Sequence, residues 1–225
     1  MYVAETFASL QGEGTLAGTP SYFIRSSGCN LRCRWCDTPY TSWLPEGVRR
    51  DVEELVAEAV ASGLRHAVVT GGEPLLQREI APLTEGLRGE GLHVTVETAG
   101  TVDPPFSCDL LSVSPKTSSS DPPGAWRVRH AAARSEFAAL RRLLGRFAEH
   151  QLKFVVVDAD DLPEILALLE SVGGVDRGRV LLMPEGRTAA EVAGRAAEVA
   201  ALCMAHGFRY TPRLQLDLFG GGRGV

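Results

Sequence analysis

The sequence lacks any long apolar run. No stretch approaches the roughly 18 consecutive apolar residues that a membrane-spanning helix requires. The first residues, MYVAETFASLQGEG, also lack the basic start and the apolar run of a secretory signal. We therefore expect a cytoplasmic protein without a membrane partner.

Positive charge is also scarce. Lys and Arg number 23 against 28 Asp and Glu, which leaves a net charge of −5. Nucleic-acid-binding domains usually carry a basic face, so this balance argues against a nucleic-acid partner. It leaves open a small anionic ligand held by a few local Arg or Lys side chains. The 225 residues are interpreted as a single domain, 1–225, which is long enough to build a full core without disulfides.

Cysteine is sparse and unevenly placed. Of the five cysteines, Cys108 and Cys203 stand alone, and we expect each to be a small buried apolar side chain. The other three crowd into the segment GCNLRCRWCDT as Cys29, Cys33 and Cys36. An odd total with this clustering, in an intracellular chain, indicates metal binding rather than disulfides.

The sequence does contain a repeated alternation of strand and helix patterns. Short runs rich in β-branched residues predict strands at 21–28, 66–72, 93–100, 109–115, 151–158 and 179–186. Helices are predicted from a capping box at Asp51 and Glu54 to Gly63, over 76–89, 134–149 and 160–172, and from a second capping box at Thr188 and Glu191 to Gly207.

This alternation predicts an α/β fold, in which right-handed βαβ units place helices outside a parallel sheet. About six strands are too few for a complete eight-stranded barrel, so an open or partial barrel fits better. We expect a mobile excursion at 117–133 and a flexible tail at 220–225.

Polar and glycine-rich residues follow most of the predicted strands. In parallel α/β folds, functional residues gather at the carboxyl ends of the strands. These ends carry 28–36, 70–74, 97–100, 114–116, Asp158 and 183–186. The sequence therefore predicts one site along one rim of the sheet, with the cluster loop 28–38 beside it.

The cysteine trio has the spacing C-x3-C-x2-C. Three thiolates can hold three irons of a 4Fe–4S cluster and leave the fourth iron open, whereas ordinary ferredoxins fill that position with a fourth cysteine. An open iron can chelate the amino and carboxylate groups of S-adenosylmethionine. Structural zinc is the alternative, but zinc sites usually show two cysteine pairs or a cysteine pair with a histidine pair, and this sequence has neither.

The trio together with GGEP at 71–74 resembles the radical S-adenosylmethionine (radical SAM) superfamily. More narrowly, the chain is similar to the 7-carboxy-7-deazaguanine synthases through the blocks at 9–38, 70–77, 96–101, 114–116 and 152–158. The resemblance implies a shortened, modified TIM-type barrel, usually in a homodimer. It implies a 4Fe–4S cluster, S-adenosylmethionine and Mg²⁺ as cofactors, with a flavodoxin-like external one-electron reductant.

The activity implied by this resemblance is a ring contraction. Enzymes of the family convert 6-carboxy-5,6,7,8-tetrahydropterin to 7-carboxy-7-deazaguanine with loss of ammonia, a step towards queuosine and other deazapurines. A 5′-deoxyadenosyl radical abstracts hydrogen from C6 of the pterin, and the hydrogen is returned after the rearrangement.

The resemblance also implies a set of substrate contacts. They are Leu10, Gln11, Gly12, Glu13, Arg25, Thr70, Glu97, Thr98 and Gln215, the last of which is expected on a C-terminal strand. Amide and carboxylate groups suit the donors and acceptors of a pterin edge, although QGEG is also good turn chemistry. A charge inside the strand FIRSSG needs a partner, and Arg25 could find it in the substrate carboxylate or in a neighbouring Glu. Ala99 and the ending QLDLFGGGRGV depart from the family pattern.

The cofactor contacts form a second set. The cluster ligands are Cys29, Cys33 and Cys36, and the Thr38 hydroxyl is the implied Mg²⁺ ligand. S-Adenosylmethionine is implied to lie against Trp35, Cys36, Asp37, Gly72, Glu73, Ser114, Pro115, Lys116, Met183, Pro184, Glu185 and Gly186.

Two other functions remain open from the residues alone. A glycyl-radical activating enzyme would share the cysteine spacing but would bind a partner protein. A simple iron–sulfur electron carrier would need a fourth ligand, for which Cys108 is the candidate. The QGEG block, with Arg25 and Glu97, favours a small carboxylated heterocycle instead.

Overall fold

The computed structural model describes residues 1–225 as one mixed sheet with helices packed around it. The strand order is β3-β1-β2-β4-β5-β6-β7-β8-β9. All pairs from β2 to β9 are parallel, while β1 runs antiparallel to both β2 and β3. Because the order ends at β3 and β9, the sheet forms a partial barrel, as the sequence predicts. The strands are β1 Tyr2–Leu10, β2 Pro20–Ser26, β3 Val48–Arg49, β4 His66–Gly71, β5 His93–Thr98, β6 Leu110–Val113, β7 His150–Val156, β8 Val180–Pro184 and β9 Arg209–Tyr210.

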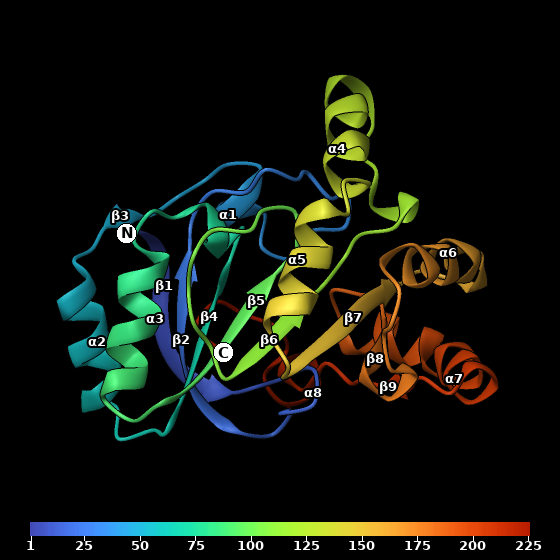
Figure 1. The fold of residues 1–225 in the computed structure, drawn as a ribbon. Helices are drawn as coiled ribbons and strands as arrows, with labels where there is room; N and C mark the ends of the chain where they lie inside the picture. The colour runs from blue at the N-terminus through green and yellow to red at the C-terminus, as the bar shows by residue number, and fades with distance from the viewer.

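Helices pack around the outside of this sheet, with α2 and α3 at one side and α6 and α7 at the other, while α4 projects beyond it (Figure 1). Their bounds are α1 Pro39–Ser42, α2 Val52–Ala61, α3 Ile80–Gly89, α4 Arg127–Arg134, α5 Ala138–Arg146, α6 Leu162–Val172, α7 Ala189–His206 and α8 Leu214–Phe219. No helix combines the length and the apolar character needed to cross a bilayer.

Local sequence explains the central strands and the longest helix. Most residues of β4 to β8 are buried, which is why these strands read as continuous apolar runs. Helix α7 begins with the predicted capping box, in which Thr188 and Glu191 bond to each other's backbone. It ends at Gly207, whose φ of 71° lies in the left-handed region that favours glycine.

Other expectations need correction. The Asp51 side chain makes no capping hydrogen bond, so the first predicted capping box is wrong, although α2 does start at the next residue. The predicted helix at 134–149 is shorter and is formed by α5, Ala138–Arg146, while Arg134 is the last residue of α4. Strands β1, β3 and β9 were not predicted, because β1 has no clear alternation of buried and exposed residues and the other two are only two residues long.

The segment at 117–133 is partly helical rather than a plain loop. It contains most of α4, and both Ser120 and His130 are buried. The tail at 220–225 folds back, and the Arg223 guanidinium lies 3.7 Å from the centre of the Tyr40 ring. The mobility of the first segment and the flexibility of the second stay predictions.

Candidate active site

The carboxyl ends of the parallel strands border one cavity of about 460 Å³. Nearly all of the predicted site residues line it, including the three clustered cysteines and the substrate set from Leu10 to Gln215. The exceptions are Glu73, Pro115, Pro184 and Gly186, which lie outside the lining. The structure therefore brings segments from both ends of the chain to a single site.

The cluster loop 28–38 runs from β2 to α1 and presents Cys29, Cys33 and Cys36 to the cavity as free thiols. Burial raises the pKa of Cys29 to about 12 and that of Cys33 to about 11. These groups therefore stay protonated at neutral pH until a metal displaces the protons. The backbone N–H of Leu31 donates to the Cys29 sulfur at 3.3 Å, a contact that also suits a thiolate bound to iron.

The donor set at this loop fits a cubane with one open iron. The cavity lining contains these three cysteines and no other cysteine or histidine. No three His, Cys, Asp or Glu side chains converge on one point, as a single metal ion would require. A cubane instead attaches each thiolate to a different iron.

Glycine at position 72 allows the GGEP turn to pack directly against the cluster loop. A Cβ atom on Gly72 would lie 2.2 Å from the Gly28 carbonyl oxygen and 2.6 Å from that of Thr41. The Glu73 N–H donates to the same Gly28 oxygen at 2.8 Å, and the Gly28 N–H donates to the Thr41 carbonyl at 2.8 Å. The glycine therefore serves a close approach of backbone to backbone.

The Glu73 carboxylate is fully buried, outside the cavity lining, and holds the end of β5. It accepts from the Thr98 hydroxyl at 2.7 Å, the Ala99 N–H at 2.8 Å and the Leu75 N–H at 3.1 Å. Burial raises the pKa of Glu73, while these hydrogen bonds satisfy the charged form. Thr98 is itself a predicted pterin contact and Ala99 follows it, so Glu73 fixes the place where that strand ends.

Glu97 is the centre of a polar group that lines the same cavity. Its carboxylate accepts from the Gln11 side-chain amide at 3.2 Å and from the Thr70 hydroxyl at 2.8 Å. The Lys153 ammonium lies 3.9 Å away. Residues from β4, β5, β7 and the QGEG loop thus converge on one carboxylate.

Glu13 lies in the same group between two cations. Its carboxylate pairs with Lys153 and, at 3.1 Å, with the Arg213 Nε atom, and it accepts from the Gln215 amide at 2.7 Å. Burial alone would raise the pKa of Glu13, but Lys153 and Arg213 outweigh it and hold the pKa well below the usual range. For Lys153, burial acts to lower the pKa, and the nearby Glu13 and Glu97 raise it instead. Both groups are therefore charged at neutral pH.

Arg213 joins this group to the cluster loop. Its guanidinium also pairs with the Asp37 carboxylate, next to Cys36, and donates to the Gly186 carbonyl oxygen. Burial would lower the pKa of Arg213, but the two carboxylates raise it. One side chain therefore joins the Glu13 group to the cluster loop.

Arg25 pairs with a neighbouring glutamate, which is one of the two partners that the sequence allows for it. Its Nε atom donates to the Glu5 carboxylate at 2.7 Å, and the Tyr40 hydroxyl donates to the same oxygen at 2.7 Å. No hydrogen bond engages the two terminal nitrogens of Arg25, which lines the cavity. The ion pair therefore fixes the guanidinium while its outer edge stays open to a ligand.

The remaining cofactor candidates lie near the cluster loop. The Lys116 ammonium donates to the Ser114 hydroxyl at 2.7 Å and lies 5.5 Å from the centre of the Trp35 ring. The Trp35 indole N–H donates to the Ser119 carbonyl at 3.1 Å, which holds the ring against the cavity. The Thr38 hydroxyl accepts from Thr41 at 3.3 Å and also lies at the cavity.

Comparison with known proteins identifies the family. The Radical SAM superfamily matches residues 23–158. The 7-carboxy-7-deazaguanine synthase of Rhodopirellula baltica is 44% identical over 100% of this chain and 89% of its own, and that of Halobacterium salinarum is 47% identical over 96% and 90%. The chain belongs to the 7-carboxy-7-deazaguanine synthase family. It is therefore a radical SAM enzyme that uses a 4Fe–4S cluster and S-adenosylmethionine.

Solved structures agree with this assignment. The crystal structure of QueE from Escherichia coli superposes with a TM-score of 0.69 at 27% identity, covering 93% of this chain and 92% of that one. The expected partial TIM-type barrel of the 7-carboxy-7-deazaguanine synthases is thus confirmed.

Several residues of the site were not predicted from the sequence. Lys153 carried a signal, because it is a charged residue inside the buried strand LKFVVVD, just as Arg25 is inside FIRSSG. Arg213 and Glu5 carried none, since their roles depend on partners far away in the chain. Gln215 was placed on a C-terminal strand, but the structure places it in helix α8.

Proposed function

We propose that this chain contracts 6-carboxy-5,6,7,8-tetrahydropterin to 7-carboxy-7-deazaguanine with release of ammonia, on the route to queuosine and other deazapurines. The observation that carries this proposal is the single cavity, which holds the cluster cysteines together with the Glu97 and Glu13 groups. A small substrate can therefore meet both the radical source and a set of polar partners.

The Glu97 side of the cavity suits the guanidine-like edge of a pterin. This edge presents several N–H donors, and the carboxylates of Glu97 and Glu13 are strong acceptors. The side-chain oxygen Oε1 of Gln215 is buried and has no hydrogen-bond partner, so it can accept from a further donor. Leu10, Gly12, Thr70 and Thr98 complete the proposed pterin contacts, with Gln11 orienting Glu97.

The outer edge of Arg25 suits the substrate carboxylate. A guanidinium grips a carboxylate through two parallel N–H bonds, and the Glu5 contact occupies only Nε. Binding here would turn the carboxylated ring carbon, C6, towards the cluster loop. Thr38 is the proposed Mg²⁺ ligand, because its hydroxyl is a hard oxygen donor that lines the same cavity as the cysteines and this arginine.

The cofactor contacts that we propose fall into two groups. Trp35, Cys36, Asp37, Gly72, Ser114, Lys116, Met183 and Glu185 line the cavity and can touch S-adenosylmethionine directly. Glu73, Pro115, Pro184 and Gly186 lie behind this lining and would shape it from outside. When bound, the cluster and S-adenosylmethionine supply the radical chemistry that removes and returns a hydrogen atom at C6.

The test is conversion by the anaerobically reconstituted full chain. Enzyme with S-adenosylmethionine, Mg²⁺, dithionite and the carboxylated pterin is expected to yield 7-carboxy-7-deazaguanine, detected by mass spectrometry with ammonia release. A chain with a complete cluster that binds S-adenosylmethionine but forms no product would contradict the proposal. We also expect a homodimer, a flavodoxin-like reductant and action in the cytoplasm; sedimentation of the pure chain tests the first.

A further inference from the structure

A group of arginines without acidic partners surrounds the cluster loop. Its members are Arg32, Arg34, Arg127, Arg129 and Arg187, which we call the arginine surface; all but the half-buried Arg32 are exposed. The acidic residues beside them are already engaged, since Asp37 pairs with Arg213 and Asp121 pairs with Arg134. The arginine surface therefore concentrates uncompensated positive charge on a chain whose net charge is −5.

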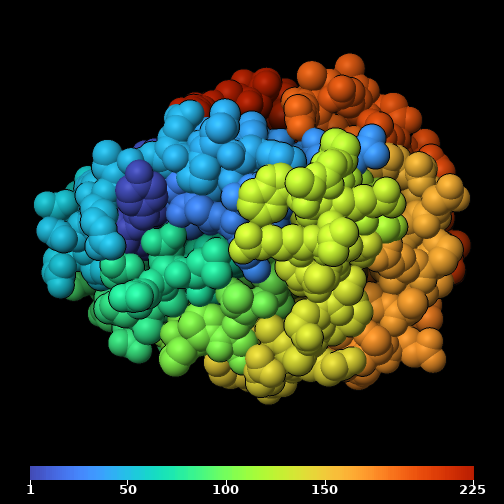
Figure 2. Space-filling model, turned by 90° about the horizontal axis from the view of Figure 1, so that it is seen from above, coloured from blue at the N-terminus to red at the C-terminus, as the bar shows by residue number.

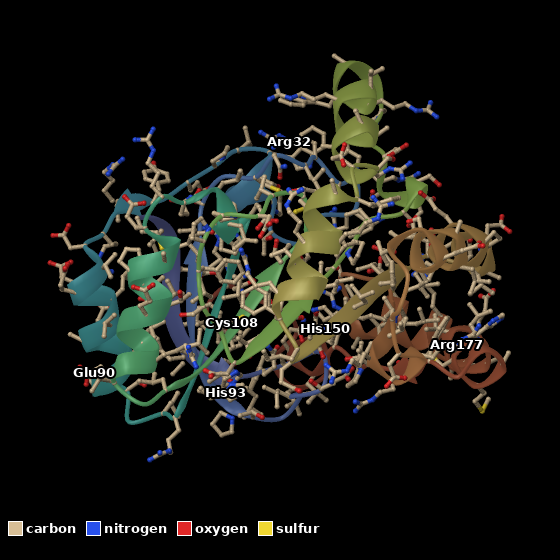
Figure 3. The ribbon with its side chains drawn as sticks, viewed as in Figure 1. Arg32, Glu90, His93, Cys108, His150 and Arg177 are labelled. Atoms are coloured by element: carbon tan, nitrogen blue, oxygen red, sulfur yellow. The ribbon has the colours of Figure 1, made fainter.

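Direct contacts join this surface to the cluster loop. The Arg32 guanidinium donates to the carbonyl oxygens of Cys29 and Leu31, both at 2.7 Å. The Trp126 ring lies between two arginines, 4.6 Å from the Arg32 guanidinium carbon and 5.5 Å from that of Arg129. Arg32, at the foot of α4, thus links a cluster ligand to the projecting helix (Figure 3).

Helix α4 is fixed in this position by buried groups. The Arg32 N–H donates to the His130 Nδ1 atom at 2.9 Å, and His130 Nε2 lies 2.9 Å from the Ser120 hydroxyl. Ser120 in turn accepts the Arg34 N–H at 2.9 Å through its carbonyl oxygen. The cluster loop and the segment around α4 therefore lie side by side on one face, as the space-filling view shows (Figure 2).

We propose that the arginine surface is the docking site of an acidic one-electron carrier protein. This inference rests on the proposed function, which requires an external reductant. One electron leaves the reduced carrier and enters the cluster, and no bond forms or breaks. Since electron transfer falls steeply with distance, the carrier has to dock beside the cluster loop. An acidic carrier is repelled by the net charge of the chain, and a local basic surface overcomes this and orients the encounter.

The surface also offers apolar contact at its centre. Val128, between Arg127 and Arg129 in the chain, is 82% exposed, and Trp126 is partly exposed. A rim of charge around exposed apolar groups is typical of transient protein interfaces. The same positive charges would attract a nucleic acid. A nucleic acid, however, does not have to bind beside the cluster loop, whereas an electron carrier does.

The test compares two double charge reversals in the reconstituted full chain. Arg127→Glu with Arg129→Glu alters the arginine surface. Arg65→Glu with Arg209→Glu makes the same change in net charge at the opposite rim, where β4 and β9 begin, with arginines that are also exposed and form no salt bridge. Binding of a bacterial flavodoxin is measured by surface plasmon resonance between about 50 and 200 mM salt, a range over which screening is appreciable.

The first pair of substitutions is expected to weaken flavodoxin binding about tenfold at low salt and to flatten its salt dependence, because it replaces attraction by repulsion. The control pair is expected to change binding by less than about twofold. Product formation driven by flavodoxin should fall with binding, whereas product formation driven by dithionite should not change.

Three results would overturn the docking proposal. These are equal weakening by both variants, no weakening by either, or salt-dependent binding of a transfer RNA that the first variant abolishes while flavodoxin binding is unaffected. Absence of product with dithionite in the unaltered chain would instead contradict the proposed function, and the binding measurement would still decide the docking site.

Discussion

Glu13 shows how a single charged residue can be both buried and necessary. Two cations, Lys153 and Arg213, hold it in the ionised form. Its removal would leave both cations without their shared partner in a largely buried place, and breaking buried pairs in this way is strongly destabilising. Its importance to folding is therefore separable from any contact with substrate.

Glu13→Gln should lower the free energy of unfolding of the apo chain by about 3–5 kcal/mol, as for other broken buried pairs. Because the pKa of Glu13 is lowered on folding, its contribution is fully present above the unfolded pKa and is lost as pH falls towards the folded pKa. Urea unfolding at pH 7 and at about pH 4 measures both effects. The difference between variant and unaltered chain should shrink at the lower pH; a constant difference would contradict the ion-pair account.

Substitution of Glu97 tests whether its polar group binds the substrate. Glu97→Gln should raise KM for the pterin about tenfold or more, because an amide accepts fewer of the substrate's N–H bonds and leaves donors unpaired. Cluster absorbance and S-adenosylmethionine binding should be unchanged. Glu90→Gln, an exposed residue after α3, is the matched control. Equal KM values for both variants would remove Glu97 from the binding site.

At the scale of elements, the GGEP turn and the cluster loop act as one packed unit. Gly72→Ala should reduce iron content several-fold after reconstitution, since the added Cβ would displace the Gly28 and Thr41 carbonyls. Gly89→Ala in α3 has open space around its Cβ and should retain full iron and stability. Iron analysis together with circular dichroism checks both variants. A full iron content in Gly72→Ala would show that the cluster loop can shift to accommodate the added Cβ.

Elements with strong local signals were predictable, and those made by tertiary contacts were not. The central strands and α7 follow from apolar runs and from the Thr188 capping box. Helix α4 does not, because its place depends on Trp126 between two arginines and on the buried His130.

The candidate site shows the same division. The cysteine spacing and the charged residue in FIRSSG were visible in the sequence, whereas Arg213 became visible only through its distant partners Glu13 and Asp37. A prediction from residue spacing can find groups that are close in the chain, but it cannot find a pair that only the fold brings together.

At the scale of the whole molecule, the two ends of the sheet differ in function. Cys108 precedes β6 and lies at the end of the sheet opposite Arg32 and the cluster loop (Figure 3). Burial raises the pKa of Cys108 to about 12, as expected for an inert thiol. It is therefore far from the position that a fourth cluster ligand would need.

Cys108→Ala should accordingly retain a complete cluster, with the iron content and the electron paramagnetic resonance spectrum of the unaltered chain. Cys33→Ala should lose it. Loss of the cluster in Cys108→Ala, with the fold intact by circular dichroism, would favour the electron-carrier alternative.

The bridge that Arg213 makes between Asp37 and Glu13 has a thermodynamic consequence. If assembly of the iron–sulfur cluster stabilises this bridge, cluster assembly raises the affinity of the chain for pterin by some factor. Bound pterin must then raise the affinity of the chain for the cluster by the same factor. Oxygen damage at the cysteines would therefore also lower the affinity for substrate at the Glu13 group. Conversely, a pterin-saturated enzyme would resist that damage longer than an empty one.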